Sequence, residues 1–337
     1  MKALKVVDRR KVAVEDVPDP RPQGNEVVVR VEAAPICGSD LHGLYQSPGA
    51  KPFVIGHEGA GVVVAVDQPA HVKVGDRVMF LPFITCGRCE WCRAGHVSYC
   101  SAKRGVYGFG LDGFQAEMVR ITESCLLPLP ESVSLEVGAL ILDPIGTPFH
   151  ACRRIGANAS QTVGVFGLGP MGLGAVANLA HLGARVIGVD PVAYRRELAI
   201  RLGAAQGVDP GAGNAVEQIR ALTQGHGLDA AMECSGHPDA LTAALDSVRP
   251  FGHVALIGES RSATISPSKH IIHKEVCLSG SCCFPLGDYA AILRALDGGL
   301  GARAGGIITH RFPLEKGPEA YGLFEGGQTG KVVFTRS

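Results

Sequence analysis

Hydrophobic residues follow two different patterns along the chain, and the change falls near residue 150. In the first 140 residues, short runs rich in β-branched residues alternate with frequent turn signals of Gly, Pro and Asp. Apolar runs bounded by turn residues predict strands. The clearest predicted strands cover residues 27–34, 59–66 and 75–80. This part of the chain is therefore expected to be β-rich.

After about residue 150, apolar runs of strand length alternate with segments whose apolar residues recur at helical spacing. Such alternation implies a parallel sheet that is covered by helices on both faces. The predicted strands are 161–167, 185–190, 228–234 and 252–258, and the predicted helices are 170–184, 192–204, 213–224 and 238–248. The last stretch adds a strand at 275–281, a helix at 287–299 and a strand at 331–335. The pattern alone leaves open which domain this tail joins.

Composition and charge exclude several functional classes. With 337 residues, of which 46% are hydrophobic, the chain is long enough for two domains with cores of their own. Lys+Arg and Asp+Glu both number 32, so the balance gives no electrostatic case for nucleic acid or an anionic membrane surface. The sequence has no apolar run of about 18 residues, so no membrane span is expected. Its charged start lacks the apolar core of a signal peptide, and we expect a cytoplasmic protein.

Four cysteines stand close together at Cys86, Cys89, Cys92 and Cys100, with the spacing C-x2-C-x2-C-x7-C. Four thiolates on one loop can close a tetrahedron around Zn²⁺, which favours sulfur ligands. No ligand position is left for water or substrate, so this zinc site is predicted to be structural. A chance cluster or a pair of disulfides is the plainer alternative, but the regular spacing favours zinc.

A glycine motif of the form G-x-G-x-x-G follows the predicted strand 161–167 and opens the next helix. It consists of Gly167, Leu168, Gly169, Pro170, Met171 and Gly172. Alone the motif is weak, but a strand before it and a helix after it are the context that dinucleotide binding requires. The first glycine permits the turn, the second admits the pyrophosphate, and the third lets helix and strand pack closely. The helix N-terminus then faces the phosphates with free N–H groups and partial positive charge.

Asp190 ends the next predicted strand and is expected to bind the adenosine ribose. Its carboxylate can accept hydrogen bonds from the ribose hydroxyls and would repel a 2′-phosphate, which favours NAD over NADP. Arg195 follows five residues later and is expected near the ribose, although a solvated helix residue is an equally simple interpretation.

Cys37, His57 and Glu58 form a second candidate metal site. A Cys and a His from separate loops, with a carboxylate nearby, match a catalytic zinc site that keeps one position open. Taken alone, Cys37 also fits a buried thiol, and His57 also fits a hydrogen-bonded core histidine.

In order along the chain, these motifs make it similar to the zinc-containing medium-chain alcohol and polyol dehydrogenases. The matching segments are C-G-S-D-x-H at residues 37–42, G-H-E-G-x-G at 56–61 and V-G-D-R-V at 74–78, together with the four-cysteine loop and the glycine motif with its aspartate. Its length and the segment DPIGTPFHA (143–151) look most similar to the sorbitol and threonine dehydrogenase branches.

The resemblance implies a fold and a set of domains. It implies an α/β plus β protein with a GroES-like β-rich catalytic domain and a doubly wound Rossmann domain. We expect the catalytic domain with the zinc lobe at 1–147, the NAD-binding domain at 148–275 and a return to the catalytic domain at 276–337. The resemblance also implies a homo-oligomer, a tetramer rather than a dimer.

The resemblance also implies roles for individual residues. Cys37 and His57 would ligate a catalytic zinc, and Glu58 would ligate it in some states or stand behind it. Ser39 and His42 would form a proton path, and Thr147 would pack against the nicotinamide. Two zinc ions per chain are therefore expected, one structural and one catalytic.

Asp143 departs from the family pattern. Some alcohol dehydrogenases place a second cysteine ligand there, and polyol dehydrogenases usually have Glu. Aspartate is one methylene shorter, so the sequence leaves open whether Asp143 reaches the zinc directly or through water. A carboxylate in place of a thiolate makes the zinc environment harder.

The predicted activity is zinc-dependent oxidation of a secondary alcohol, polyol or sugar-like, with hydride transfer to NAD⁺. The alternatives are oxidation of an amino alcohol, as by L-threonine 3-dehydrogenase, and a dinucleotide-binding protein that has lost catalysis. The adjacent pair Cys282 and Cys283 has no place in this account. It is interpreted as a packing feature, with a redox-sensitive contact as the alternative.

Overall fold

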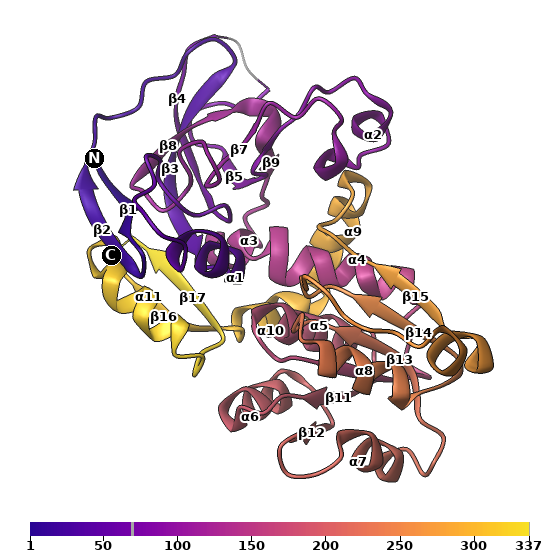
Figure 1. Ribbon diagram of the computed structural model, residues 1–337. Coiled ribbons are helices and arrows are strands. Elements are labelled where there is room, and N and C mark those ends of the chain that lie inside the picture. Colours follow the sequence, from indigo (N-terminus) through magenta and orange to yellow (C-terminus); the bar gives the residue numbers. More distant parts are fainter. Residues whose placement is uncertain (69–70, 337) are drawn as a thin grey trace. The chain divides into compact units, whose positions relative to one another are not determined.

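The computed structural model describes residues 1–68 and 71–336, which form two compact units (Figure 1). The first unit comprises Met1–Leu142, Pro285–Gly287 and Ile308–Ser337. The second unit comprises Asp143–Phe284 and Asp288–Ile307.

The second unit is built on a parallel sheet of six strands in the order β12-β11-β10-β13-β14-β15. This is the strand order of a doubly wound dinucleotide-binding fold, in which the sheet grows from a central strand in both directions. The strands are β10 (Thr162–Phe166), β11 (Arg185–Val189), β12 (Gln206–Val208), β13 (Leu228–Glu233), β14 (Val248–Leu256) and β15 (Cys277–Gly280).

Helices cover both faces of this sheet. α5 packs on β10 and β11, whereas α8 packs on β13 and β14 (Figure 1). Right-handed crossovers that proceed in opposite directions from β10 place these helices on opposite faces. The helices are α4 (Gly146–Arg154), α5 (Pro170–His181), α6 (Ala193–Leu202), α7 (Ala215–Leu222), α8 (Pro238–Ser247), α9 (Tyr289–Ala295) and α10 (Gly301–Gly305).

Local residue chemistry sets the ends of these helices. Pro170 and Pro238 stand at the start of α5 and α8, where the missing N–H costs nothing. The Asn214 side chain accepts a hydrogen bond from the Val216 N–H and caps α7. Gly203, with φ +114°, ends α6 in a conformation that other residues rarely adopt.

The first unit is built on a mixed sheet in the order β16-β17-β3-β4-β5-β9, and β8 also pairs with β3. β3 thus pairs with three strands, and its register with β4 shifts at two points, which is typical of β-bulges. The strands are β3 (Glu26–Pro35), β4 (Ala60–Val66), β5 (Arg77–Phe80), β8 (Met118–Thr122), β9 (Leu126–Pro128), β16 (Ile308–Phe312) and β17 (Lys331–Thr335). The short helices are α1 (Gly38–Asp40), α2 (Glu90–Arg93) and α3 (Leu135–Ala139).

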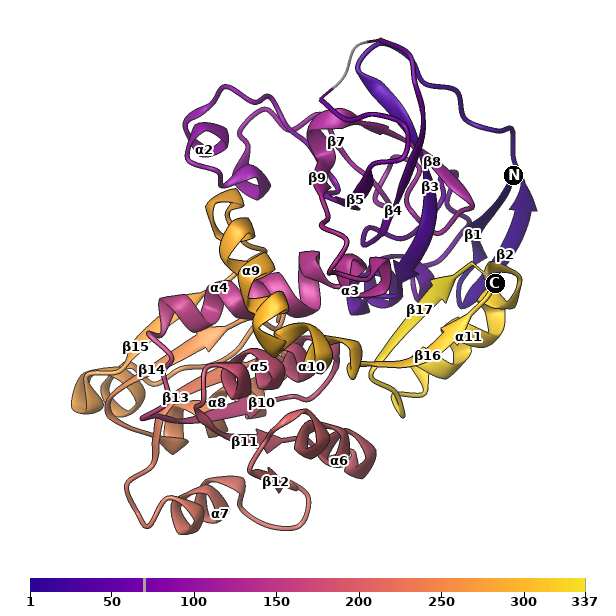
Figure 2. The same ribbon diagram turned by 180° about the vertical axis from the view of Figure 1, so that it is seen from behind.

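The two ends of the chain lie side by side in the first unit. The hairpin β1 (Lys2–Asp8) and β2 (Lys11–Asp16) lies beside α11 (Gly317–Glu325), as Figures 1 and 2 both show. The buried hydroxyl of Tyr321 on α11 donates to Gln115 Oε1 at 2.9 Å. The C-terminal segment therefore completes the first unit.

The structure confirms the predicted fold class and places the tail differently from our expectation. β15 pairs in parallel with β14, so residues after 276 continue the second unit's sheet instead of leaving it. The chain returns to the first unit at Ile308, apart from the brief segment Pro285–Gly287, and the first boundary falls at Asp143. The sequence did not predict the β1–β2 hairpin, because charged residues interrupt its apolar pattern. It did not predict β12 either, because three residues are too few to show a pattern. Among the described residues, no helix is long and apolar enough to cross a membrane.

Candidate metal centres and dinucleotide site

The four predicted cysteine ligands come together in one lobe of the first unit. Their sulfur atoms all lie within 4.8 Å of one another. The lobe is closed at its base by the two-stranded sheet β6 (Phe83–Ile84) and β7 (Gly105–Val106), and α2 begins directly after Cys89. The backbone N–H groups of Cys86 and Cys89 point at Cys100 Sγ and Cys86 Sγ, at 3.3 and 3.4 Å.

Backbone N–H groups favour the thiolate form, which binds metal, at Cys86 and Cys89, whereas burial raises the pKa of Cys92 to about 11. Hydrogen bonds from the backbone N–H groups of Cys92 and Ser101 lower the pKa of Cys89 to about 6. Backbone N–H groups of Arg88 and Cys89 also lower the pKa of Cys86. Four clustered sulfur donors in a field of N–H donors fit a closed zinc site.

The second predicted group also assembles, with ligand atoms of Cys37, His57 and Glu58 within 4.8 Å of one another. The carboxylate of Asp143 falls in the same group. Cys37 follows the end of β3, whereas His57 and Glu58 immediately precede β4. A thiol, an imidazole and two carboxylates form the mixed donor set of an open zinc site.

Asp40 holds this group together, and the sequence analysis assigned it no role. Its fully buried carboxylate accepts a hydrogen bond from the Cys37 N–H at 3.0 Å and another from His57 Nδ1 at 2.8 Å. The second bond leaves Nε2 as the imidazole nitrogen that can ligate a metal. The aspartate stands in the motif C-G-S-D-x-H, but its role depends on its burial beside His57, which the sequence does not show.

Lys331 is a second residue that the sequence analysis missed. Its ammonium group lies 2.5 Å from Glu58 Oε1, and both side chains are fully buried. A buried carboxylate needs such a partner, because desolvation of an uncompensated charge costs several kcal/mol. The two residues are 273 positions apart in the sequence, so no local sequence pattern could have linked them.

Ser39 and His42 stand at different depths of the site. Ser39 Oγ lies 3.4 Å from His57 Nε2 and is partly buried. His42 is exposed, and its Nδ1 lies 3.0 Å from Gln46 Oε1. The structure therefore brings Ser39 to the metal group and places His42 at the solvent.

The glycine motif takes the form that dinucleotide binding requires. Gly167 has φ +86°, and a Cβ on Gly172 would lie 1.8 Å from the Gly167 carbonyl oxygen. Above Gly169, by contrast, a Cβ would meet open space. No side chain caps the N-terminus of α5, whose first residues are Pro170 and Met171. This arrangement offers free N–H groups to a pyrophosphate.

Asp190 lies at the carboxyl end of β11, next to this loop. One carboxylate oxygen accepts from the Leu168 N–H at 2.7 Å, and the other accepts from the Val192 N–H at 2.8 Å. Arg195 Nη1 lies 3.9 Å from the same carboxylate. Thr147 is buried on α4, and its carbonyl oxygen accepts a hydrogen bond from Ser281 Oγ.

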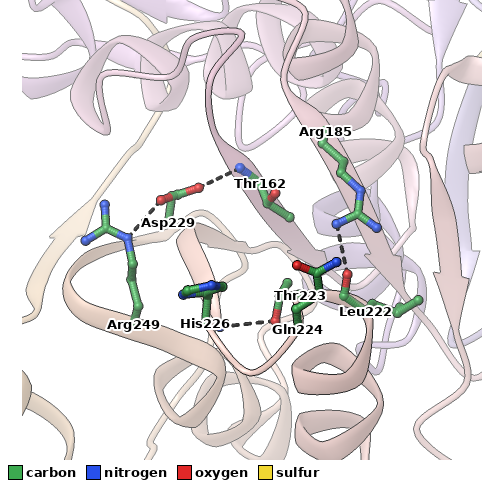
Figure 3. A pocket seen from close by; sticks show the side chains of 9 residues that line it. Thr162, Arg185, Leu222, Thr223, Gln224, His226, Asp229 and Arg249 are labelled. Atoms are coloured by element: carbon green, nitrogen blue, oxygen red, sulfur yellow. Dashed lines mark hydrogen bonds and ion pairs between the residues drawn. The ribbon is translucent and has the colours of Figure 1, made fainter.

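A cavity of about 480 Å³ lies at the opposite edge of the same sheet (Figure 3). Thr162 and Arg185, which begin β10 and β11, line it, so it is distant from the carboxyl ends where dinucleotides bind. Polar groups that line this cavity form hydrogen bonds with one another. Arg249 Nε donates to Asp229 at 2.8 Å, and that carboxylate accepts from the Thr162 N–H at 2.7 Å. We assign this cavity no part in the site.

Comparison with known proteins places the chain in a family. The family described as alcohol dehydrogenase GroES-like domain matches residues 23–131, and that described as zinc-binding dehydrogenase matches residues 170–298. The chain belongs to the zinc-containing medium-chain dehydrogenases. This membership confirms the predicted family.

Individual relatives agree with this assignment. Sorbitol dehydrogenase from Bacillus subtilis is 36% identical over 77% of this chain and 75% of its own. L-threonine 3-dehydrogenase from Caldanaerobacter subterraneus is 32% identical over 92% of this chain and 91% of its own. The solved alcohol dehydrogenase from Thermus sp. ATN1 has a TM-score of 0.90 and 32% identity, with both chains fully covered.

The protein is thus a zinc-dependent oxidoreductase that acts on alcohols with a nicotinamide dinucleotide. The described residues fit both zinc and a dinucleotide. They offer two clusters of zinc donors and a glycine loop with an open face.

Replacing Cys89 with serine should lower the zinc content from two ions per chain to one. It should also lower the free energy of unfolding by at least about 2 kcal/mol, because a structural zinc contributes its binding energy to folding. Metal analysis and urea denaturation measure the two effects. Cys277→Ser, at an exposed cysteine of β15, is the matched control and should keep both ions. One zinc or none in active wild-type protein would contradict the two-site account.

Proposed function

We propose that this dehydrogenase oxidises the secondary hydroxyl of a polyol or sugar-like substrate to a ketone and transfers the hydride to NAD⁺. The observation that supports this most strongly is the mixed donor group of Cys37, His57, Glu58 and Asp143. Two carboxylates beside one thiol and one imidazole make a harder site than one with two thiolates, and a harder site suits oxygen-rich substrates.

Cys37 and His57 would hold the catalytic zinc, with a carboxylate of Asp143 or Glu58 completing the site. When bound, the zinc ion polarises the substrate oxygen, and the dinucleotide accepts the hydride. Asp40 fixes the imidazole so that Nε2 faces the metal position. Lys331 holds Glu58 by its Oε1 and so limits how far this carboxylate can move.

Ser39 is the residue that we assign to the substrate proton. Its hydroxyl lies 3.4 Å from His57 Nε2, the imidazole nitrogen that we expect to face the metal and the substrate oxygen. The exposed His42, three residues further on, would pass the proton to solvent. General acid–base steps of this kind contribute about 10²–10⁴-fold to the rate.

The second candidate substrate is an amino alcohol such as L-threonine. It is favoured by the 32% identity to an L-threonine 3-dehydrogenase over nearly the whole chain. A noncatalytic dinucleotide-binding role is the least supported alternative, because the donor group and Ser39 are intact.

Assays of NAD⁺ reduction with polyols, L-threonine and simple primary alcohols separate these functions. We expect the highest kcat/KM with a polyol and a loss of about 10²-fold or more in Cys37→Ser, because polarisation of the substrate oxygen would be lost. Cys277→Ser serves as the control and should keep wild-type activity. The highest kcat/KM with L-threonine would decide for the amino alcohol, and no turnover of any substrate would decide for the noncatalytic role.

We further propose that NAD⁺ is preferred over NADP⁺ because of Asp190. A buried carboxylate at the ribose position would face a 2′-phosphate of like charge, which costs several kcal/mol when desolvated. Of the two nearby arginines, Arg196 donates to the Asp190 carbonyl oxygen and pairs with Asp209 at 3.0 Å. Arg195, at 3.9 Å from the Asp190 carboxylate, is the one placed to turn toward a phosphate.

Asp190→Ser should shift the ratio of kcat/KM for NAD⁺ and NADP⁺ toward NADP⁺ by about tenfold or more, because the repulsion is removed. The double variant Asp190→Ser/Arg195→Ala should lose most of that gain, whereas Asp190→Ser/Arg201→Ala, at an exposed arginine of the same helix, should keep it. The role assigned to Asp190 would be wrong if the wild-type protein used both cofactors equally well.

The oligomeric state and the cellular compartment stay predictions. From the resemblance we predict a homo-oligomer, a tetramer rather than a dimer, and we expect it in the cytoplasm.

A further inference from the structure

Cys282 and Cys283 place two thiols side by side at the carboxyl edge of the second unit's sheet. They follow β15 directly, and their sulfur atoms are 4.0 Å apart. Cys282 is exposed and Cys283 is partly exposed, so the interpretation as core packing is wrong for Cys282. Small oxidants from solvent can therefore reach this pair.

The pair is held in place by buried residues on both sides. Ser281 is buried, and its N–H donates to the Leu256 carbonyl oxygen at 2.9 Å, which extends the pairing with β14. Phe284 is also buried, and its ring stacks on Tyr289 at 6.5 Å between centroids. Between these anchors, Cys283 has φ +54°, a left-handed conformation that residues other than glycine seldom adopt. Such conformations persist where the surroundings fix them, and they often mark functional sites.

We propose that Cys282 and Cys283 form a reversible oxidation site, at which hydrogen peroxide converts the two thiols to a vicinal disulfide and thereby weakens dinucleotide binding. The exposed Cys282 thiol loses its proton, and the thiolate attacks the peroxide. The O–O bond breaks, and the sulfenic acid forms together with hydroxide, which takes up the released proton as water. The Cys283 thiol then attacks the sulfenic sulfur and releases a second water. Each sulfur loses one electron and one proton, and the peroxide is reduced.

The disulfide would be easy to reduce again. Consecutive Cα atoms lie about 3.8 Å apart across a trans peptide. Disulfides usually span about 4.4 Å or more between Cα atoms, so a bond between neighbours is strained. Strained and exposed disulfides are the labile ones that serve regulation.

The buried cysteines outside the metal groups do not compete for this chemistry. Burial raises the pKa of the Cys125, Cys152 and Cys234 thiols, that of Cys125 to about 12, so all three are poor nucleophiles. Cys277 is exposed on β15, and in the extended strand Leu278, Ser279, Gly280 and Ser281 separate it from Cys282.

The proposed effect on dinucleotide binding depends on the neighbouring Ser281. This step of the proposal rests on the proposed function. Ser281, the residue before Cys282, donates its hydroxyl to the carbonyl oxygen of Thr147 at 3.3 Å. Thr147 is the residue that we expect beside the nicotinamide. Closing a strained ring at Cys282 would move the Ser281 backbone and disturb this contact.

Peptide mapping of the zinc-loaded protein tests the oxidation site. After stoichiometric hydrogen peroxide, alkylation and trypsin digestion, the peptide 275–294 should lose the mass of two hydrogen atoms and carry an alkyl label only on Cys277. Dithiothreitol before alkylation should restore all three labels. Cys282→Ser and Cys283→Ser should abolish the disulfide, and Cys277→Ser should leave it intact. A disulfide that persists without Cys282 or disappears without Cys277, or no disulfide at all, would overturn the site.

Binding of NADH, followed by its fluorescence, tests the coupling. Oxidation should raise the Kd for NADH by about threefold or more in the wild type and in Cys277→Ser. It should not change the Kd in Cys283→Ser. A disulfide without a change in Kd would overturn the coupling. Failure of the reduced protein to bind NADH would instead refute the proposed cofactor site, while the peptide map would still decide on the oxidation.

Discussion

The group of residues that we propose as the catalytic zinc site is organised around one buried carboxylate. Asp40 accepts hydrogen bonds from the Cys37 N–H and from His57 Nδ1, and so fixes two residues on separate segments of the first unit. A buried carboxylate with two donors has little freedom to move, because loss of either bond would leave a charge unsolvated. This anchor fixes the Cys37 backbone and the orientation of the His57 imidazole, whose Nε2 lies 3.4 Å from Ser39 Oγ.

In the second unit, the glycine loop before α5 leaves room for a dianionic pyrophosphate to approach the protein backbone. Gly167 and Gly172 make room by contacts that any side chain would block, and Asp190 ties the glycine loop to the end of β11. The same carboxylate would discriminate against a phosphate on the ribose. The cysteine pair after β15 lies at this same edge of the sheet, where a change in backbone geometry would reach Thr147 through Ser281.

Much of this structure could be predicted from the sequence, because the decisive signals were local. The four-cysteine loop, the glycine motif and the alternation of strands and helices lie within short windows, and the fold class and family followed from them. Long-range partners could not be predicted. Lys331 pairs with Glu58 only in the folded protein, because the two residues are far apart in the sequence. Asp40 can orient His57 only after folding has placed the two side chains together. The resemblance led us to expect the return to the catalytic domain at residue 276, but β15 still pairs with β14 and the chain returns only at Ile308. The strand pattern could not correct this, because it does not reveal which sheet a strand joins.

The most direct test of this account is the zinc affinity of the Cys37/His57 site in Asp40→Asn, measured by chelator competition together with kcat/KM. Asparagine keeps the size of the side chain but removes the charge and one acceptor. Residues that orient a metal ligand in this way typically contribute 10–100-fold to affinity or activity, so we expect a loss of about that size, with the four-cysteine site still loaded. Unchanged zinc affinity and unchanged kcat/KM would contradict the claim that Asp40 organises the site.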